Sequence, residues 1–242
     1  WTKKTLYLMY GTVLTMKVDL IDHMGSDLTV VNAARVSFNK ESEWQYWPAD
    51  DNTDNISEFL NDKDKKLISY LAKHNHWTPF GHCSAQFRIS APIFVARQLV
   101  KHQVGLVWNE VSRRYVSDSP EFWRASDWRE VASDKKQGSS DQVIKENDTI
   151  SYVYRETVRH CIDTYNLMLD KGVCPEQART ILPQSLYTEW YWSGTLAAFA
   201  RVCNLRVSKD TQKETREIAE LISSEMNKLF PVSWKVLSNE SI

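Results

Sequence analysis

KHQVGLVWNEVSRRY, residues 101–115, is the stretch that constrains the fold most strongly. Its apolar residues Trp108, Val111 and Tyr115 do not form a stripe along a helix, which favours an extended chain. In an extended chain alternate side chains lie on one face, which here carries an acceptor, a hydroxyl and a cation. These side chains are Glu110, Ser112 and Arg114. The alternative is a helix on which the first and last of them form an exposed i,i+4 ion pair, worth about 0.3–0.5 kcal/mol.

This combination of side chains suits a nucleotide. An arginine offers a planar fork to phosphate oxygens, and a serine offers a short donor. Just upstream, Arg97 and Lys101 are four residues apart on a predicted helix, and Gln98 and His102 share the adjacent face. We therefore expect residues 97–115 to contribute to a local anion site.

Outward from this stretch, hydrophobic periodicity predicts a mixture of strands and long helices. Strands are expected at residues 16–22, at 83–90 and in the aromatic segment after Pro183; helices are expected at 27–38, 58–73, from Pro92 to 103, 143–170, just before Pro183, 195–206 and 211–229. Thr211 and Glu214 form a T-x-x-E capping box for the last helix. Residues 39–57 and 124–142 lack a period and are predicted loops. Because no βαβ alternation is visible, the fold class is α+β in a single domain.

Composition narrows the possible functions. The 242 residues carry a net charge of −1, so general attraction to nucleic acid or to an anionic membrane is not expected. Only seven glycines are present and no Gly-rich phosphate loop occurs, so phosphates must be held by side chains. The four cysteines are widely spaced, which favours free thiols and a cytoplasmic location.

No apolar run approaches the roughly 20 residues of a membrane span. Residues 1–15 resemble a signal peptide but lack a suitable cleavage site, so we interpret them as an upstream extension. Residues 16–242 then form the single domain.

The central stretch resembles the signature of the flavin-dependent thymidylate synthases. That signature has a basic triplet Arg-His-Arg, seven residues and a serine, with Asn-Glu before the serine and Arg-Tyr after it. Here Lys101-His102-Gln103 is followed by eight residues and Ser112, flanked by Asn109-Glu110 and Arg114-Tyr115. Two arginines of the triplet are therefore replaced, and the spacer has one extra residue. A phosphate or flavin contact made by those arginines would be weakened, and Arg97 and Arg113 are the candidates to compensate.

Four further segments are similar to elements of the same family. They are HWTPFGH (76–82), APIFVARQ (91–98), PEQARTILP (175–183) and CNLRVSKDTQKE (203–214). Together with the central motif they occur in the family's order and span most of residues 16–235. The resemblance implies an α+β domain with an antiparallel sheet flanked by long helices, the thymidylate synthase-complementing protein fold.

The resemblance also implies a homotetramer that converts dUMP to dTMP, with FAD as cofactor, NADPH as reductant and methylenetetrahydrofolate as carbon donor. The residues that would bind dUMP are Gln98, Lys101, Glu110, Ser112, Arg114, Arg179 and Arg206. The residues that would contact FAD are Ser37, His76, Thr78, Lys101, His102, Gln103, Glu110, Thr195 and Arg201, with Ala197 aligned to a further position. Arg206 would be the catalytic residue, because a fixed guanidinium stabilises negative charge developing on the uracil ring.

Other residues suggest alternative sites and functions. His74, His76 and His82 lack a carboxylate or a suitably oriented cysteine, so no metal site is expected. The aromatic residues at 187 and 190–192 are expected in the core or in a subunit interface. A single-stranded nucleic-acid-binding module and a metal-dependent nucleotide hydrolase are the rival functions.

Overall fold

The computed structural model describes residues 15–46, 58–116, 119–132 and 139–238. Contacts divide the chain into two compact units. The first comprises Trp1–Lys17, Ile89–Lys101 and Asn109–Trp190, and the second comprises Val18–Arg88, His102–Trp108 and Tyr191–Ile242. Residues 1–14 of the expected upstream extension and residues 47–57 of the first predicted loop lie outside the described residues.

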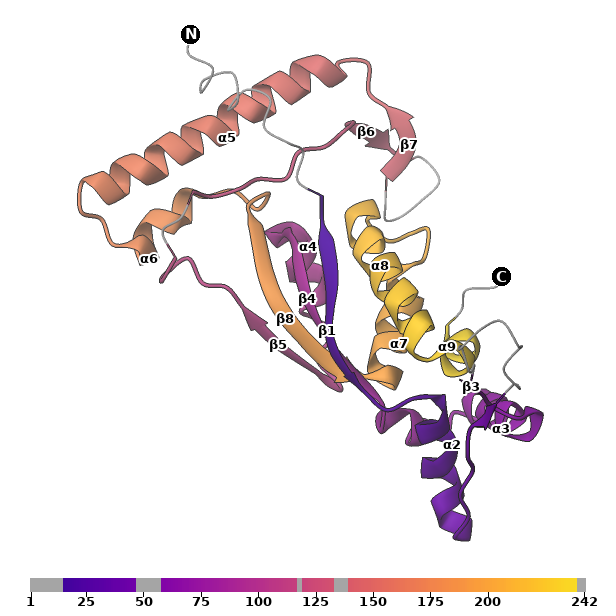
Figure 1. The fold of residues 1–242 in the computed structure, drawn as a ribbon. Helices are drawn as coiled ribbons and strands as arrows, with labels where there is room; N and C mark the ends of the chain where they lie inside the picture. The colour runs from indigo at the N-terminus through magenta and orange to yellow at the C-terminus, as the bar shows by residue number, and fades with distance from the viewer. Residues whose placement is uncertain (1–14, 47–57, 117–118, 133–138, 239–242) are drawn as a thin grey trace, which may run out of the picture. The chain divides into compact units, whose positions relative to one another are not determined.

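Four strands form a sheet with the order β1-β4-β8-β5 (Figure 1). Its strands are β1 (Lys17–Met24), β4 (Ser84–Pro92), β5 (Leu106–Glu110) and β8 (Tyr187–Thr195). The amide of Ile93 donates to the Leu186 carbonyl, and that of Leu196 donates to the Cys83 carbonyl. Between these two bonds the residue numbers rise along β4 while they fall along β8, so the two strands pair in antiparallel orientation. The α+β class with an antiparallel sheet is thus confirmed.

Strand β4 shows the alternation from which a strand was predicted at residues 83–90. Ala85, Phe87, Ile89 and Ala91 are buried, whereas the side chains between them are more accessible. In the second unit the ring of Phe87 meets that of Phe199 edge-on, with centroids 5.1 Å apart. These contacts make β4 a core strand.

The aromatic residues of β8 are core residues with one exception. Trp190 and Trp192 are almost completely buried and Tyr187 is buried, as expected. Tyr191 is 43% exposed, because it points to the opposite face from its two tryptophan neighbours.

Most helices of the second unit pack through amphipathic faces. They are α2 (Asp27–Arg35), α3 (Asp62–Lys73), α7 (Leu196–Arg206), α8 (Lys213–Leu229) and α9 (Pro231–Leu237), with the 3₁₀ turns η1 (Val36–Phe38) and η2 (Pro79–Gly81). Helix α7 packs against α8, and α9 packs against α3 and α8. The buried Asp27 carboxylate accepts the amides of Val232 and Ser233, each at 2.8 Å, and so caps the N-terminus of α9.

A second buried carboxylate, that of Asp64, organises the start of α3. Arg35 donates to its Oδ1 from Nη2 at 2.5 Å and from Nε at 3.2 Å. Ser42 donates to the same oxygen, and Asn61 donates to Oδ2 at 2.8 Å. The Asp64 side chain is fully buried, so this network compensates the cost of removing its charge from water.

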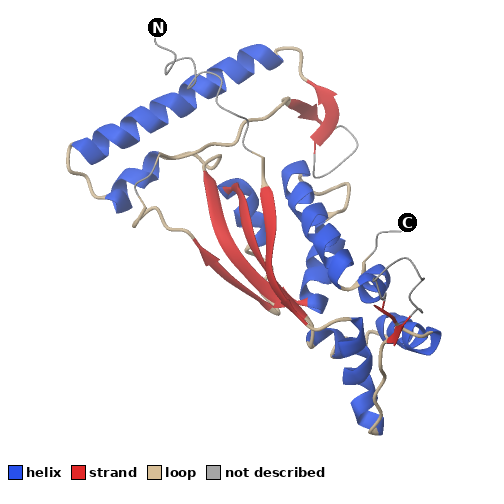
Figure 2. Ribbon diagram, in the orientation of Figure 1, coloured by secondary structure: helices blue, strands red, loops and turns tan. Residues whose placement is uncertain are grey.

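The first unit contains the longest helix of the described chain (Figure 2). Its helices are α4 (Ile93–Leu99), α5 (Asn147–Asp170) and α6 (Pro175–Ala178), followed by the 3₁₀ turn η3 (Arg179–Ile181). The Tyr154 hydroxyl on α5 donates to the Trp123 carbonyl at 2.7 Å, and the Trp128 indole donates to Ser151 Oγ at 3.0 Å. These bonds attach α5 to the segment that precedes it.

Several predicted boundaries are wrong, each for a local reason. The helix expected from residue 58 begins at Asp62, because the Asn61 side chain caps it by accepting the Asp64 amide. The last long helix is preceded by Gln212 as N-cap, since the Thr211 hydroxyl donates instead to the Leu205 carbonyl.

Each predicted loop contributes to a short antiparallel hairpin. In the first, β2 (Gln45–Tyr46) pairs with β3 (Glu58–Phe59), which lies where the helix was expected to start. In the second, β6 (Arg129–Val131) pairs with β7 (Ser139–Val143). None of the described helices is long and apolar enough to cross a membrane.

The four cysteines differ in environment, which predicts their reactivity. Burial, followed by the nearby Asp27 carboxylate, raises the pKa of the Cys83 thiol to about 12, so it stays protonated at neutral pH. Cys174 is exposed. We expect a thiol-specific reagent to modify Cys174 in the native protein and Cys83 only after unfolding, as measured by mass spectrometry of digests. Rapid labelling of Cys83 in the folded protein would contradict this packing.

Candidate functional site

A cavity of about 440 Å³ in the first unit collects several polar side chains. It is lined by Ser90, Ile93, Glu110, Val111, Arg113, Val116, Ser119, Glu121, Arg179, Leu182, Leu186, Tyr187, Thr188 and Glu189. Of the predicted dUMP ligands, Glu110 and Arg179 line it. Of the two residues expected to compensate for the altered triplet, Arg113 lines it as well and Arg97 does not. Two guanidinium groups beside carboxylates and hydroxyls can bind an anion that also carries sugar hydroxyls.

Glu110 is held at the end of β5. The Thr188 hydroxyl donates to Glu110 Oε1 at 2.7 Å, and the next amide, that of Val111, donates to the Glu189 carbonyl at 2.8 Å. The carboxylate is therefore oriented by the neighbouring strand β8. Thr188 was not predicted as a site residue, because nothing local distinguishes it within an aromatic strand.

Ser112 and Arg114 do not continue the strand. Strand β5 ends at Glu110, and the Tyr115 amide donates to the Ser112 carbonyl in a turn. Ser112 Oγ accepts from the Arg114 amide and Nε at 3.4 and 3.3 Å, and the Arg114 guanidinium lies 5.0 Å from the centroid of the Tyr115 ring. The prediction of one strand face for these residues is wrong, and so is the helical alternative.

Arg179 lies in η3, just after α6. Its Nε donates to the Glu176 carbonyl at 3.3 Å, while the side chain remains exposed at the cavity. One end of the guanidinium is thus fixed by the backbone. The charged edge that faces the cavity can contact a ligand.

Gln98 and Lys101 do not line this cavity. Helix α4 ends at Leu99, so the faces predicted to pair Arg97 with Lys101 and Gln98 with His102 do not exist in that form. Lys101 is exposed, and Gln98 is half-buried.

In the second unit, His102 meets the end of α7. Arg206 Nε donates to His102 Nε2 at 3.0 Å, and Arg201 Nη2 donates to the Val104 carbonyl at 2.8 Å. Burial first, and then the positive charges of Arg206 and Arg201, lower the pKa of His102. Burial also lowers the pKa of Arg206, which nevertheless stays a cation in the neutral range. His102 is therefore a neutral acceptor for a charged donor.

A tight turn after Gln103 brings these groups together. The Leu106 amide donates to the Gln103 carbonyl, and Gly105 adopts φ +76° at the third position, as a type II turn requires. A Cβ on Gly105 would lie 3.1 Å from that of Ala198 on α7. This turn lies in the spacer that is one residue longer than the family pattern, and it replaces the predicted continuation of the helix to 103.

The remaining predicted flavin contacts are dispersed over the second unit. Thr195 Oγ1 accepts the Ala198 amide and caps α7, while Ala197 is buried. Ser37, His76 and Thr78 are exposed, and the His76 ring lies near those of Tyr70 and His74. Among the described residues no group of three metal-ligating side chains is found.

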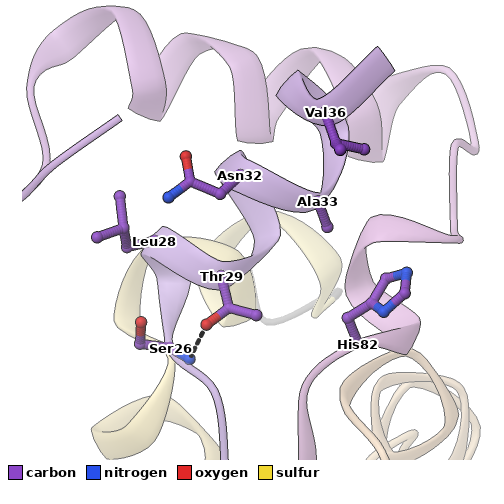
Figure 3. Close-up of a pocket in the computed structure, with 7 residues that line it drawn as sticks. All are labelled: Ser26, Leu28, Thr29, Asn32, Ala33, Val36 and His82. Carbon is purple, nitrogen blue, oxygen red and sulfur yellow. Dashed lines mark hydrogen bonds between the residues drawn. The ribbon is translucent and has the colours of Figure 1, made fainter. Parts of the chain in front are cut away.

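A second cavity, of about 460 Å³, opens beside α2 (Figure 3). It is lined by Ser26, Leu28, Thr29, Asn32, Ala33, Val36 and His82. Thr29 Oγ1 accepts the Ser26 amide, and the Asn32 side chain bonds to the backbone of Ser42 at both its ends. These polar groups already serve the fold, so this cavity offers few groups for catalysis.

Comparison with known proteins assigns the family. A sequence model of the thymidylate synthase complementing protein matches residues 19–232. The chain belongs to this family.

Two curated relatives show how far this family likeness extends. A flavin-dependent thymidylate synthase of Thermus thermophilus is 34% identical over 217 residues, which cover 90% of this chain and 73% of the relative. That of Kosmotoga olearia is 32% identical over 226 residues, covering 92% and 90%. The family membership inferred from the sequence motifs is therefore confirmed.

A solved structure of this thymidylate synthase complementing protein fold is also similar. The UMP/dUMP methylase PolB from Streptomyces cacaoi, bound with 5-Br UMP, superposes with a TM-score of 0.76 at 26% identity. The match covers 92% of this chain and 93% of that one. This solved relative is thus named as a methylase of UMP and dUMP, and the likeness covers most of the chain.

Proposed function

We propose that this protein converts dUMP to dTMP by reductive methylation, with methylenetetrahydrofolate as carbon donor and FAD, reduced by NADPH, as hydride carrier. The observation that carries the proposal is the cavity that unites Glu110, Arg113 and Arg179 in a chain of this family. The relatives named as flavin-dependent thymidylate synthases and as a UMP/dUMP methylase support both the substrate class and the flavin dependence.

The nucleotide is held by charge and by hydrogen bonds in this proposal. The Arg179 and Arg113 guanidinium groups bind the phosphate, and the Glu110 carboxylate accepts from a sugar hydroxyl. By the family resemblance, Gln98, Lys101, Ser112 and Arg114 complete the dUMP ligands. Ser112 acts as a binding hydroxyl, because its contact in the described structure is with Arg114 and not with a base that could activate it.

Arg206 is the proposed catalytic residue. Its guanidinium would lie against the uracil and stabilise the ionised, carbon-nucleophilic ring. His102 accepts the hydrogen bond from Arg206 Nε, which leaves both terminal amino groups of Arg206 for the nucleotide. A guanidinium can bond to both partners at once, because its five N–H donors point in different directions within one plane.

The donor set of the second unit fits a flavin nucleotide. Arg201 is a cation suited to phosphates and to the flavin carbonyls, and the His102 ring keeps a second nitrogen for a ligand. The proposed FAD contacts are Ser37, His76, Thr78, Lys101, His102, Gln103, Glu110, Thr195 and Arg201. When bound, the flavin supplies hydride chemistry, while the protein binds and orients the reactants. A homotetramer, a cytoplasmic location and sites for NADPH and folate belong to the same proposal.

Substitution of Arg179 by alanine tests the phosphate contact. Loss of one charge-assisted hydrogen bond costs about 1.5–3 kcal/mol, so we expect the KM for dUMP to rise about tenfold or more. Arg179→Lys restores part of the affinity, because a point charge remains without the fork. An unchanged KM in Arg179→Ala, measured by steady-state kinetics, would remove Arg179 from the site.

The function itself is tested by product analysis. The protein is incubated with dUMP, methylenetetrahydrofolate, NADPH and FAD, and each component is omitted in turn. We expect dTMP only in the complete mixture. Release of deoxyuridine or phosphate without flavin, abolished by a chelator, would instead support the metal-dependent hydrolase. Salt-dependent binding to oligonucleotides would support the nucleic-acid-binding module.

A further inference from the structure

The hydrogen bond between Arg206 and His102 joins the last residue of α7 to the residue just before the turn at 103–106. Arg206 Nε donates to His102 Nε2 at 3.0 Å, and both side chains are half-buried. A neutral imidazole carries one N–H and one acceptor nitrogen. Because Nε2 accepts here, the proton of neutral His102 lies on Nδ1.

The partner of Arg206 is unusual in being uncharged. Among the residues that the structure describes, no carboxylate pairs with the Arg206 guanidinium. A carboxylate partner would orient the guanidinium but cancel much of its charge. A neutral imidazole orients it and leaves the charge available to a ligand.

The turn that directly follows His102 is itself fixed to α7. The Val104 carbonyl accepts from Arg201 Nη2 at 2.8 Å, and the Gly105 carbonyl accepts the Thr195 amide at 3.2 Å. Gly105 lies so close to α7 that a Cβ there would crowd Ala198. His102 is therefore held at a fixed place relative to Arg206.

We propose that His102 is a positioning residue that aims the Arg206 guanidinium at the substrate ring while leaving its positive charge uncompensated. This role rests on the proposed function of the site. The imidazole acts through Arg206, and its Nδ1–H remains able to donate to a ligand.

The role has a defined pH dependence. The charged groups that act on His102 are Arg206 and Arg201, both from α7, and each disfavours the imidazolium. Protonation would turn Nε2 into a donor and break the bond to Arg206. Since the pKa of His102 is lowered, the bond persists at neutral pH and is lost only below the ordinary histidine value of about 6.5.

Two substitutions of His102 by amide side chains test the inference. In His102→Gln the amide oxygen can reach the position of Nε2 and accept from Arg206, without titrating. In His102→Asn the amide ends near the position of Nδ1, so the acceptor is misplaced. His160→Asn, an exposed histidine on α5, is the matched control.

The readout is the ionisation of a bound uracil analogue. The flavin-loaded protein is titrated with 5-fluoro-dUMP, without folate or reductant, and ¹⁹F NMR follows ring ionisation against pH. A well-aimed guanidinium makes the bound ring about tenfold more acidic than the free nucleotide. We expect this increase in ring acidity in the unsubstituted protein, in His102→Gln and in His160→Asn. We expect it to be lost in His102→Asn. We expect the kcat of His102→Asn to fall about tenfold. In the unsubstituted protein we expect kcat to decrease at acidic pH as His102 becomes protonated, and we expect this decrease to be absent in His102→Gln.

Each outcome decides the inference. Equal ring acidity and kcat in His102→Asn and the unsubstituted protein would overturn the positioning role while the proposed function stands. Equal losses in both His102 variants would also overturn it, since the acceptor would then not matter. Failure of the unsubstituted protein to bind the analogue and to form dTMP would overturn the proposed function together with the inference.

Discussion

Replacing Arg206 by alanine lowers kcat for dTMP formation by about a hundredfold, because one to two charge-assisted hydrogen bonds to the ionised ring are lost at about 1.5–3 kcal/mol each. Binding of dUMP changes less than kcat, since the charge on the ring develops fully only as the reaction proceeds. The measurement is steady-state kinetics of the flavin-loaded protein, with the dissociation constant of dUMP determined separately.

Two further variants give this result its meaning. Arg155→Ala removes an exposed arginine of α5 and is expected to leave kcat unchanged. Arg206→Lys keeps a cation but loses the Nε–H that donates to His102, so it recovers only part of the rate. Near-normal kcat in Arg206→Ala would remove Arg206 from catalysis.

Replacing Asp64 by alanine destabilises the protein by about 3–5 kcal/mol, since it breaks a buried ion pair and leaves Arg35 without its partner. Ser42 and Asn61 lose their acceptor as well. The measurement is equilibrium unfolding in urea or guanidinium, followed by circular dichroism.

Asp62→Ala is the matched control for this prediction. Asp62 begins the same helix, but its side chain is 88% exposed and its oxygen lies 3.6 Å from Lys65 Nζ. Exposed pairs of this kind contribute about 0–1 kcal/mol, so the stability should hardly change. Similar losses in both variants would show that the buried network contributes no more than an ordinary helix charge.

The parts of the fold that were predicted are those with one buried face. Strand β4 and helix α8 each show a period of apolar residues that matches a single buried side. Helix α9 was missed, because its N-terminus is capped by Asp27, which lies 205 residues before the amide of Val232. The hairpin of β6 and β7 was missed because its strands are short and largely polar.

For the candidate site, the motifs predict individual residues but not their geometry. Glu110 and Arg179 were named from the motifs, and the structure places both at one cavity. The end of β5 at Glu110 could not be foreseen, since no local pattern shows the turn that follows it, in which the Tyr115 amide donates to the Ser112 carbonyl. The contact between His102 and Arg206 joins residues 104 positions apart, so it follows from the tertiary fold and not from any local pattern.

The most direct test of the proposed function is anaerobic visible spectroscopy of the FAD-loaded protein. We predict that NADPH bleaches the flavin absorbance. We also predict that the absorbance returns only when dUMP and methylenetetrahydrofolate are added together, with one dTMP formed for each flavin reoxidised. A protein that takes up no FAD, or whose flavin is reoxidised without formation of dTMP, would contradict the account.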